Sequence, residues 1–154
     1  MTWSGTLLHI HTCPAGGQGM TEQMSATCIA GVGIEGDRYA TGTGHYSKLP
    51  DIREITLIEI GTLTALNRDH GITLMPHQHR RNLTVEAVPL NHLVGKRFTV
   101  GDVVLEGGRL NTPCVYLDKL VGQPVCKKLW NRSGLNCHII EGGSIQLGMT
   151  IQPV

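Results

Sequence analysis

Aromatic side chains are scarce in this sequence of 154 residues, which contains only two Trp, three Tyr and one Phe. The core that a chain of this size can bury must therefore be built mainly from Leu, Ile and Val. Charged residues are also few, at 16% of the sequence, and the formal net charge is +1. A net charge so near zero gives no electrostatic case for nucleic acid or an anionic membrane as the main partner.

Long apolar runs are missing as well, and the N-terminus lacks the pattern of a secretory signal peptide. We therefore expect a cytoplasmic protein without a membrane partner. The five cysteines are an odd number, and no two of them form a Cys-x-x-Cys pair. This argues against a disulfide framework and against a zinc ribbon. No pattern in the sequence reports on the oligomeric state.

Glycine, in contrast, is abundant, with 20 residues that separate short apolar segments. The predicted strands are 5–11, 26–34, 54–58, 81–88, 96–100, 103–106, 135–141 and one or two within 144–153. The predicted loops are 13–24 and 35–50. Helices are predicted from Ile60 to just before Gly71, over 90–94, over 125–131 and around Cys114. Seven to nine short strands with two to four inserted helices favour one mainly β domain over residues 1–154, with a closed or curled antiparallel-rich sheet.

Cys114 carries the clearest chemical signal. Thr112 suits the N-cap of a helix, Pro113 suits its first position, and Gly122 follows as a stop. Cys114 would then lie in the first helical turn, where free N–H groups and the helix dipole stabilise a negative charge on sulfur. The deprotonated sulfur is the form that attacks as a nucleophile and binds metals. The alternative is a small side chain packed beneath a helix end.

The segment Gly31–Gly36 matches the pattern G-x-G-x-x-G and follows a predicted strand. A dinucleotide-binding motif must also open a helix, and the residues that follow show no apolar stripe, so a Rossmann fold is not favoured. A tight turn is the simplest interpretation. A further interpretation is that Gly36-Asp37-Arg38 presents an arginine that Asp37 orients.

Arg80-Arg81-Asn82 lies at the entry to a predicted strand. An Arg pair is most often a solvated strand end. A guanidinium group can also grip carboxylate or phosphate oxygens through two N–H groups at once, and Asn82 adds a donor and an acceptor. Two arginine-bearing turns, at Arg38 and Arg81, are what a domain needs to hold an anionic organic cofactor.

Histidines suggest a metal site at two places. His9, His11 and Cys13 would share one face of a strand, and His77-x-His79 forms a second pair. A zinc site needs three or four ligands, and no other pattern points to the same place. Ordinary polar positions are therefore the favoured interpretation.

Five short motifs occur along the chain in a characteristic order. They are Gly33-Ile34-Glu35-Gly36-Asp37-Arg38, Arg81-Asn82-Leu83-Thr84-Val85, Gly101-Asp102-Val103-Val104-Leu105-Glu106, Pro113-Cys114 and Gly142-Gly143. Together they resemble the MOSC domain, which occurs at the C-terminus of molybdenum-cofactor sulfurases and in stand-alone bacterial proteins of about this length. The resemblance runs from the first predicted strand to the last, and it implies a MOSC-type, barrel-like fold.

The resemblance also implies a site. It makes Cys114 the catalytic residue and the molybdenum ligand, and it implies a binding pocket for the molybdenum cofactor. The residues assigned to that pocket are Gly36, Asp37, Arg38, Arg81 and Asn82. The family often has His directly after the first arginine, where this chain has Tyr39.

Three hypotheses for function follow. The first is a molybdenum-cofactor protein that reduces N-hydroxylated substrates with electrons from a redox partner protein. The second is a sulfur carrier, in which Cys114 accepts sulfane sulfur from a pyridoxal-phosphate-dependent cysteine desulfurase. The third is a binding or adaptor domain in which Cys114 only packs.

Overall fold

The computed structural model describes residues 2–154, which contain eleven short strands, three α-helices and two 3-10 helices. The strands are β1 Gly5–Thr12, β2 Thr21–Gln23, β3 Ser25–Ile29, β4 Gly33–Ile34, β5 Ile55–Glu59, β6 Leu83–Glu86, β7 Arg97–Val100, β8 Val103–Leu110, β9 Leu135–Glu141, β10 Gly143–Gln146 and β11 Thr150–Pro153. The helices are α1 Arg38–Thr41, α2 Ile60–His70, η1 Leu90–His92, α3 Val115–Val121 and η2 Lys127–Leu129. None of these described helices has the length and apolar composition needed to cross a bilayer.

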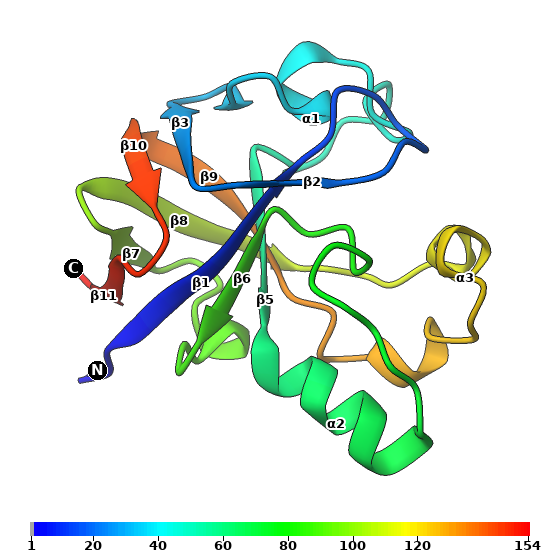
Figure 1. Ribbon diagram of the computed structural model, residues 1–154. Coiled ribbons are helices and arrows are strands. Elements are labelled where there is room, and N and C mark those ends of the chain that lie inside the picture. Colours follow the sequence, from blue (N-terminus) through cyan, green and yellow to red (C-terminus); the bar gives the residue numbers. More distant parts are fainter. Residues whose placement is uncertain (1) are drawn as a thin grey trace.

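Seven of the strands close into a barrel. They follow the order β11-β7-β8-β9-β5-β6-β1, and β11 pairs with β1 to complete the ring, while β2 continues the sheet beyond β1. Only β5 and β6 run parallel within this sheet, because α2 carries the chain from the end of β5 back toward the start of β6 (Figure 1). The mainly β, barrel-like fold predicted from the sequence is confirmed.

A second, three-stranded sheet has the order β10-β3-β4 and lies at the end of the molecule that Figure 1 shows at the upper left. Its strands pair through Gly143↔Cys28 and Cys28↔Ile34. This small sheet leads directly into α1, so it fixes the start of the segment that carries Asp37 and Arg38.

The barrel core is aliphatic, as the sequence composition predicts. Phe98 is the one aromatic residue among its fully buried side chains in the described chain, and Trp3 packs against it with ring centroids 6.3 Å apart. A second apolar cluster joins α2, α3 and η2 outside the barrel. Its buried members are Leu63, Leu66, Ile72, Leu74, Leu117, Val125 and Leu129. This cluster anchors α3 beside the barrel.

Several local predictions are confirmed. Gly71 and Gly122 end α2 and α3 in the left-handed conformation, with φ of 65° and 67°. Such ends favour glycine because a side chain is strained at positive φ. The Gly101-Asp102 dipeptide joins β7 and β8 as an antiparallel hairpin, as its sequence indicates.

Four boundaries were predicted wrongly. The predicted loop 13–24 contains β2, which exists because it pairs with β1 through Ile10↔Gln23. The predicted strand 26–34 is divided between β3 and β4, and the predicted loop 35–50 contains α1. Helix α1 has only four residues, too few for an apolar stripe to appear in the sequence. The predicted helix over 125–131 is reduced to the three residues of η2.

Candidate functional site

A cavity of about 320 Å³ is lined by residues of the loop after β1, of the segment from α1 to β5, and of α3 with the residues just before it. Its lining residues are Gly16, Gly17, Arg38, Tyr39, His45, Tyr46, Leu49, Arg53, Thr56, Arg80, Arg81, Arg109, Asn111, Thr112, Cys114, Tyr116, Leu117, Leu120 and Asn136. The cavity brings together Arg38, Arg81 and Cys114, which are widely separated in the sequence. A volume of this size is at the lower end of the range for small-molecule sites.

The cavity is basic, although three of its arginines form ion pairs with carboxylates that lie outside the lining. Five of the eight arginines in the sequence line it, and none of the described lining residues is Asp or Glu. Arg53 and Arg109 were not singled out by the sequence analysis, because each stands alone in its segment. An enclosed concentration of guanidinium groups favours an anionic ligand.

Asp37 orients the first of these arginines. Its carboxylate caps the N-terminus of α1, accepts a hydrogen bond from the Cys13 backbone N–H at 3.0 Å and accepts another from Arg38 Nη1 at 3.3 Å. Arg38 also donates through Nη2 to the Arg80 carbonyl oxygen at 3.0 Å, which joins the two arginine-bearing turns. Gly36 forms the tight turn before them, with φ of 81°, and lies in a separate surface groove beside Thr27.

Arg81 is held entirely by neutral groups. It donates from Nε to the Ser133 carbonyl oxygen at 3.0 Å, and from Nη2 to Ser133 Oγ and Asn111 Oδ1 at 2.7 Å each. Its Nη1 donates to the His79 carbonyl oxygen at 3.0 Å, and within the described chain it makes no ion pair. Burial, and next the charge of Arg38, lower the pKa of Arg81 to about 10. It therefore stays charged at neutral pH with no protein carboxylate to balance the charge.

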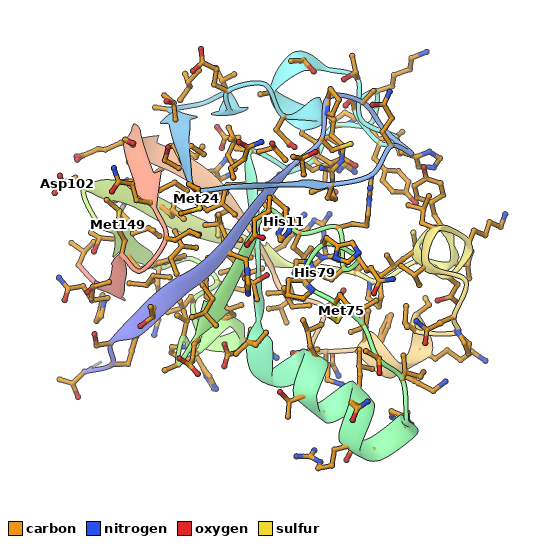
Figure 2. All side chains as sticks on the ribbon, viewed as in Figure 1. His11, Met24, Met75, His79, Asp102 and Met149 are labelled. Atoms are coloured by element: carbon orange, nitrogen blue, oxygen red, sulfur yellow. The ribbon has the colours of Figure 1, made fainter. Side chains whose placement is uncertain are left out.

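His79 shapes the turn that presents Arg81. Its Nδ1 accepts a hydrogen bond from the Arg81 backbone N–H at 2.9 Å, so the ring proton belongs on Nε2, which donates to Thr84 Oγ1 at 2.8 Å. Figure 2 shows His79 beside His11 at the middle of the molecule, and their ring centroids are 6.4 Å apart. Burial lowers the pKa of both histidines, that of His79 well below its usual value.

The loop from α1 to β5 is tied down by Asp51. Its carboxylate accepts hydrogen bonds from Arg109 on β8, through Nε at 2.7 Å and through Nη2, and from Arg53 Nη2 at 3.1 Å. Arg53 also donates to the carbonyl oxygens of Tyr46 and Leu49, at 3.0 and 2.8 Å. The loop is therefore fixed to the barrel on one side of the cavity.

Cys114 is the N-cap of α3 rather than a residue of its first turn, so the predicted positions of Thr112 and Pro113 in the helix were wrong. Asn111 is tied to the barrel end through its backbone N–H and the Gly134 carbonyl oxygen, and the Pro113 ring disfavours helical backbone at Thr112. Cys114 keeps extended backbone, with φ of −135°, and its side chain caps no N–H group among the described residues. The thiol is half-buried in the cavity wall, which argues against a purely packing role.

The sequence predicts that the N–H groups of the helix start stabilise the Cys114 sulfur. In the structure the neighbouring polar group is instead the Tyr46 hydroxyl, whose oxygen lies 2.9 Å from Cys114 Sγ. Burial, and next the contact with Cys114, raise the pKa of Tyr46 to about 12. Tyr46 belongs to no sequence motif, although the unusual length of the predicted loop 35–50 is a signal of function.

An aromatic wall lines the cavity around Tyr46, and it includes all three tyrosines of the sequence. His45 stacks on Tyr116, with ring centroids 3.8 Å apart and an interplanar angle of 11°. Tyr46 meets His45 edge-on at 4.5 Å, and the Arg38 guanidinium lies over the Tyr39 ring at 4.7 Å. Flat faces beside guanidinium groups suit a planar ligand.

Asn82 lies in the barrel wall and not on the cavity. Its Oδ1 accepts from the backbone N–H and the hydroxyl of Thr56, both at 3.1 Å, and its Nδ2 donates to the His11 carbonyl oxygen at 3.2 Å. It thereby joins β5, β6 and β1 with its side chain buried. This geometry gives Asn82 a structural role beneath Arg81, and a direct cofactor contact stays a prediction.

The histidine pairs do not build a metal centre. His9 Nδ1 lies 2.6 Å from Glu22 Oε1, and the Cys13 thiol donates to the Ala15 carbonyl oxygen at 2.7 Å. Within residues 2–154 no group of three or more His, Cys, Asp or Glu side chains is placed to hold a metal ion.

The family model of the MOSC domain matches residues 45–152, a span that includes Cys114, Arg81 and most of the cavity lining. This chain belongs to the MOSC domain family.

Solved structures with the same fold include the YuaD protein of Bacillus subtilis, with a TM-score of 0.82, 16% identity and coverage of 98% of this chain and 97% of that one. YiiM of Geobacillus stearothermophilus follows with a TM-score of 0.76, 13% identity and coverage of 97% and 75%. YiiM of Escherichia coli has a TM-score of 0.68, 15% identity and coverage of 100% and 70%. Identities this low establish a shared fold alone. No curated protein matches this chain in sequence.

Proposed function

We propose that the basic cavity binds the molybdenum cofactor, with the Cys114 sulfur as the protein's ligand to molybdenum, and that the protein reduces N-hydroxylated substrates. One observation carries the proposal. A half-buried cysteine shares a cavity of about 320 Å³ with five arginines, and none of the described lining residues is a carboxylate.

The side chains present fit the chemistry of the cofactor. Thiolate sulfur is a soft ligand that suits a redox-active metal. Arg81 has a charge that no described carboxylate balances, and it is suited to the cofactor's phosphate. Tyr39, Tyr46 and Tyr116 line the cavity and offer aromatic surface to its flat ring system. When bound, the group supplies a metal that exchanges electrons with a substrate.

The chain's own residues then bind and orient. Arg80 and Arg81 bind the anionic end of the cofactor, the aromatic wall orients flat groups, and Cys114 fixes the position of the metal. Reduction of an N-hydroxyl group to an N–H group consumes two electrons and two protons and releases water. We propose that a separate redox partner protein delivers those electrons.

Molybdenum and pterin analysis tests the proposal. Protein purified from a host that makes the cofactor is expected to contain molybdenum in the wild type and in Cys126→Ala, and to lose it in Cys114→Ala. Cys126 is the matched control because it is the other half-buried cysteine in the described chain and does not line the cavity. Wild-type protein with neither molybdenum nor pterin contradicts the proposal.

The sulfur-carrier hypothesis is the second candidate, and it is favoured by the position of Cys114 at a cavity that opens to solvent. In that case the Cys114 thiolate attacks the terminal sulfur of a desulfurase persulfide, and the donor cysteine returns to its thiolate form. Mass spectrometry after incubation with a cysteine desulfurase is then expected to show one added sulfur atom in the wild type and none in Cys114→Ala. Cofactor-free wild-type protein that accepts no sulfur excludes this second candidate.

A further inference from the structure

The Cys114 sulfur has an unusual environment for a residue at a helix start. Its side chain caps no N–H group among the described residues, so the helix end does not hold it. The hydrogen-bonding group at the sulfur is the Tyr46 hydroxyl, at 2.9 Å, which belongs to a loop 68 residues earlier in the chain. The contact therefore depends on the tertiary fold.

Tyr46 is itself held in place from several directions. Its carbonyl oxygen accepts a hydrogen bond from Arg53 Nη1 at 3.0 Å, and the Arg53 guanidinium lies over its ring at 5.4 Å. The ring packs edge-on against His45 at 4.5 Å and against Tyr116 at 6.3 Å. Arg53 is in turn bound by Asp51, which is anchored to Arg109 on β8. The phenol oxygen is thus fixed relative to the barrel before any ligand binds.

From this geometry we infer that Tyr46 is a positioning residue for Cys114, whose O–H donates to the sulfur and holds it toward the cavity. The inference deepens the proposed function and rests on it for the metal, while the behaviour of the free thiol tests it independently. A hydrogen bond to sulfur stabilises negative charge there. Hydrogen bonds around a metal-bound thiolate also orient the ligand and adjust the electronic properties of the metal.

Thiol labelling of the cofactor-free protein tests the inference. Tyr46→Phe removes only the hydroxyl and keeps the ring packing. Iodoacetamide at a fixed pH, with each cysteine quantified by mass spectrometry, gives the labelling rate of Cys114 relative to Cys126. Because the hydroxyl holds the sulfur toward the cavity, where the reagent reaches it, this ratio is expected to fall roughly threefold or more in Tyr46→Phe.

Tyr116→Phe is the matched control, since Tyr116 lines the same cavity and packs against Tyr46, while Tyr46 supplies the hydroxyl at the sulfur. Its labelling ratio is expected to equal that of the wild type. An unchanged ratio in Tyr46→Phe, or an equal fall in both variants, overturns the inference.

A second measurement uses the loaded protein. Tyr46→Phe is expected to lose molybdenum several times faster than the wild type during dialysis, whereas Thr99→Val, which removes a hydroxyl on β7 away from the cavity, is expected to keep it as the wild type does. Equal loss from the wild type and Tyr46→Phe counts against the inference. Wild-type protein that never takes up molybdenum contradicts the proposed function, and the labelling ratio still decides the role of Tyr46.

Discussion

At the scale of single residues, the main feature of the site is a buried arginine whose hydrogen-bond partners are all neutral. Arg81 is surrounded by the neutral acceptors Ser133, Asn111 and His79. A buried charge without an opposite charge is costly for the folded protein. A bound anion would remove this cost, so the proposed function makes Arg81 the anchor for an anionic ligand.

Arg81→Lys tests this role while keeping the charge. A lysine cannot reach Ser133, Asn111 and His79 at once, so the geometry of the anion site is expected to be lost. Inorganic phosphate titrated into cofactor-free protein by calorimetry is expected to bind about tenfold or more weakly to the variant, which corresponds to the loss of one charge-assisted hydrogen bond. Arg97→Lys is the control, since Arg97 pairs with Glu106 away from the cavity. Equal phosphate affinity in Arg81→Lys and the wild type excludes Arg81 as the anchor.

At the scale of elements, the loop between α1 and β5 places Tyr46 and Arg53, and Asp51 fastens that loop to β8. The hydrogen bonds from Arg109 lower the pKa of the Asp51 carboxyl to about 2. The folded state therefore holds this group ionised at pH values where the unfolded chain, with a pKa near 3.8, takes up a proton. Its contribution to stability is complete above about pH 5 and is lost as the pH falls from about 4 to 2.

Asp51→Asn is accordingly expected to reduce the free energy of unfolding by about 1 kcal/mol at pH 6, a value kept small because the side chain is partly exposed. Urea unfolding of both proteins between pH 6 and pH 2 measures the difference. The two curves are expected to approach each other below pH 4 and to meet near pH 2. A difference that stays constant down to pH 2 shows that the carboxylate charge is not the cause.

Gly134 belongs to the segment that brings Ser133 to Arg81. Its φ is 106°, and a Cβ added there would overlap the Leu57 carbonyl oxygen of β5. Gly134→Ala is expected to lower the free energy of unfolding by about 3 kcal/mol or more, through strained backbone and a contact that cannot relax. Gly122→Ala has the same kind of φ but meets open space, so about 1 kcal/mol is expected there. Thermal unfolding measures the stability of both variants. Equal decreases in the free energy of unfolding would show that the overlap with the Leu57 carbonyl oxygen does not destabilise Gly134→Ala.

At the scale of the whole molecule, the barrel encloses polar groups as well as aliphatic side chains. His11 and His79 are buried on neighbouring strands and loops of the barrel, 3% and 0% exposed. Burial lowers the pKa of each below the value of the unfolded chain. The unfolded state therefore binds more protons below about pH 6.5, and folding becomes less favourable as the pH falls through that range.

The free energy of unfolding is expected to decrease between pH 7 and pH 5 by up to about 1.4 kcal/mol per pH unit for each buried histidine. His79→Asn keeps an acceptor for the Arg81 N–H and removes one titrating ring, so its stability is expected to depend less on pH. His92→Asn, on the surface, serves as the control and is expected to follow the wild type. Urea unfolding at three pH values measures the slopes. If the free energy of unfolding depends on pH with the same slope in all three proteins, His79 is not the cause of that dependence.

Local sequence signals were sufficient where a structure depends on neighbouring residues. Gly71 and Gly122 ended their helices, Gly101-Asp102 turned its hairpin, and the scarcity of aromatic residues led to an aliphatic core. The resemblance to the MOSC domain assigned Arg38, Arg81 and Cys114 to one site, and in the structure all three line the same cavity.

The tertiary structure decided what the sequence left open. The sequence by itself determined a glycine-rich, mainly β fold, and it predicted Cys114 and its arginines as the chemical groups. Only the closed barrel brings the Tyr46 hydroxyl to the Cys114 sulfur and the Asp51 carboxylate to the Arg109 guanidinium. It also buries the Asn82 side chain in the barrel wall, where it accepts from Thr56. Each of these contacts joins segments at least 26 residues apart. Hydrophobic periodicity reports only on neighbours along the chain, whereas such pairs exist only once the strands have closed the ring.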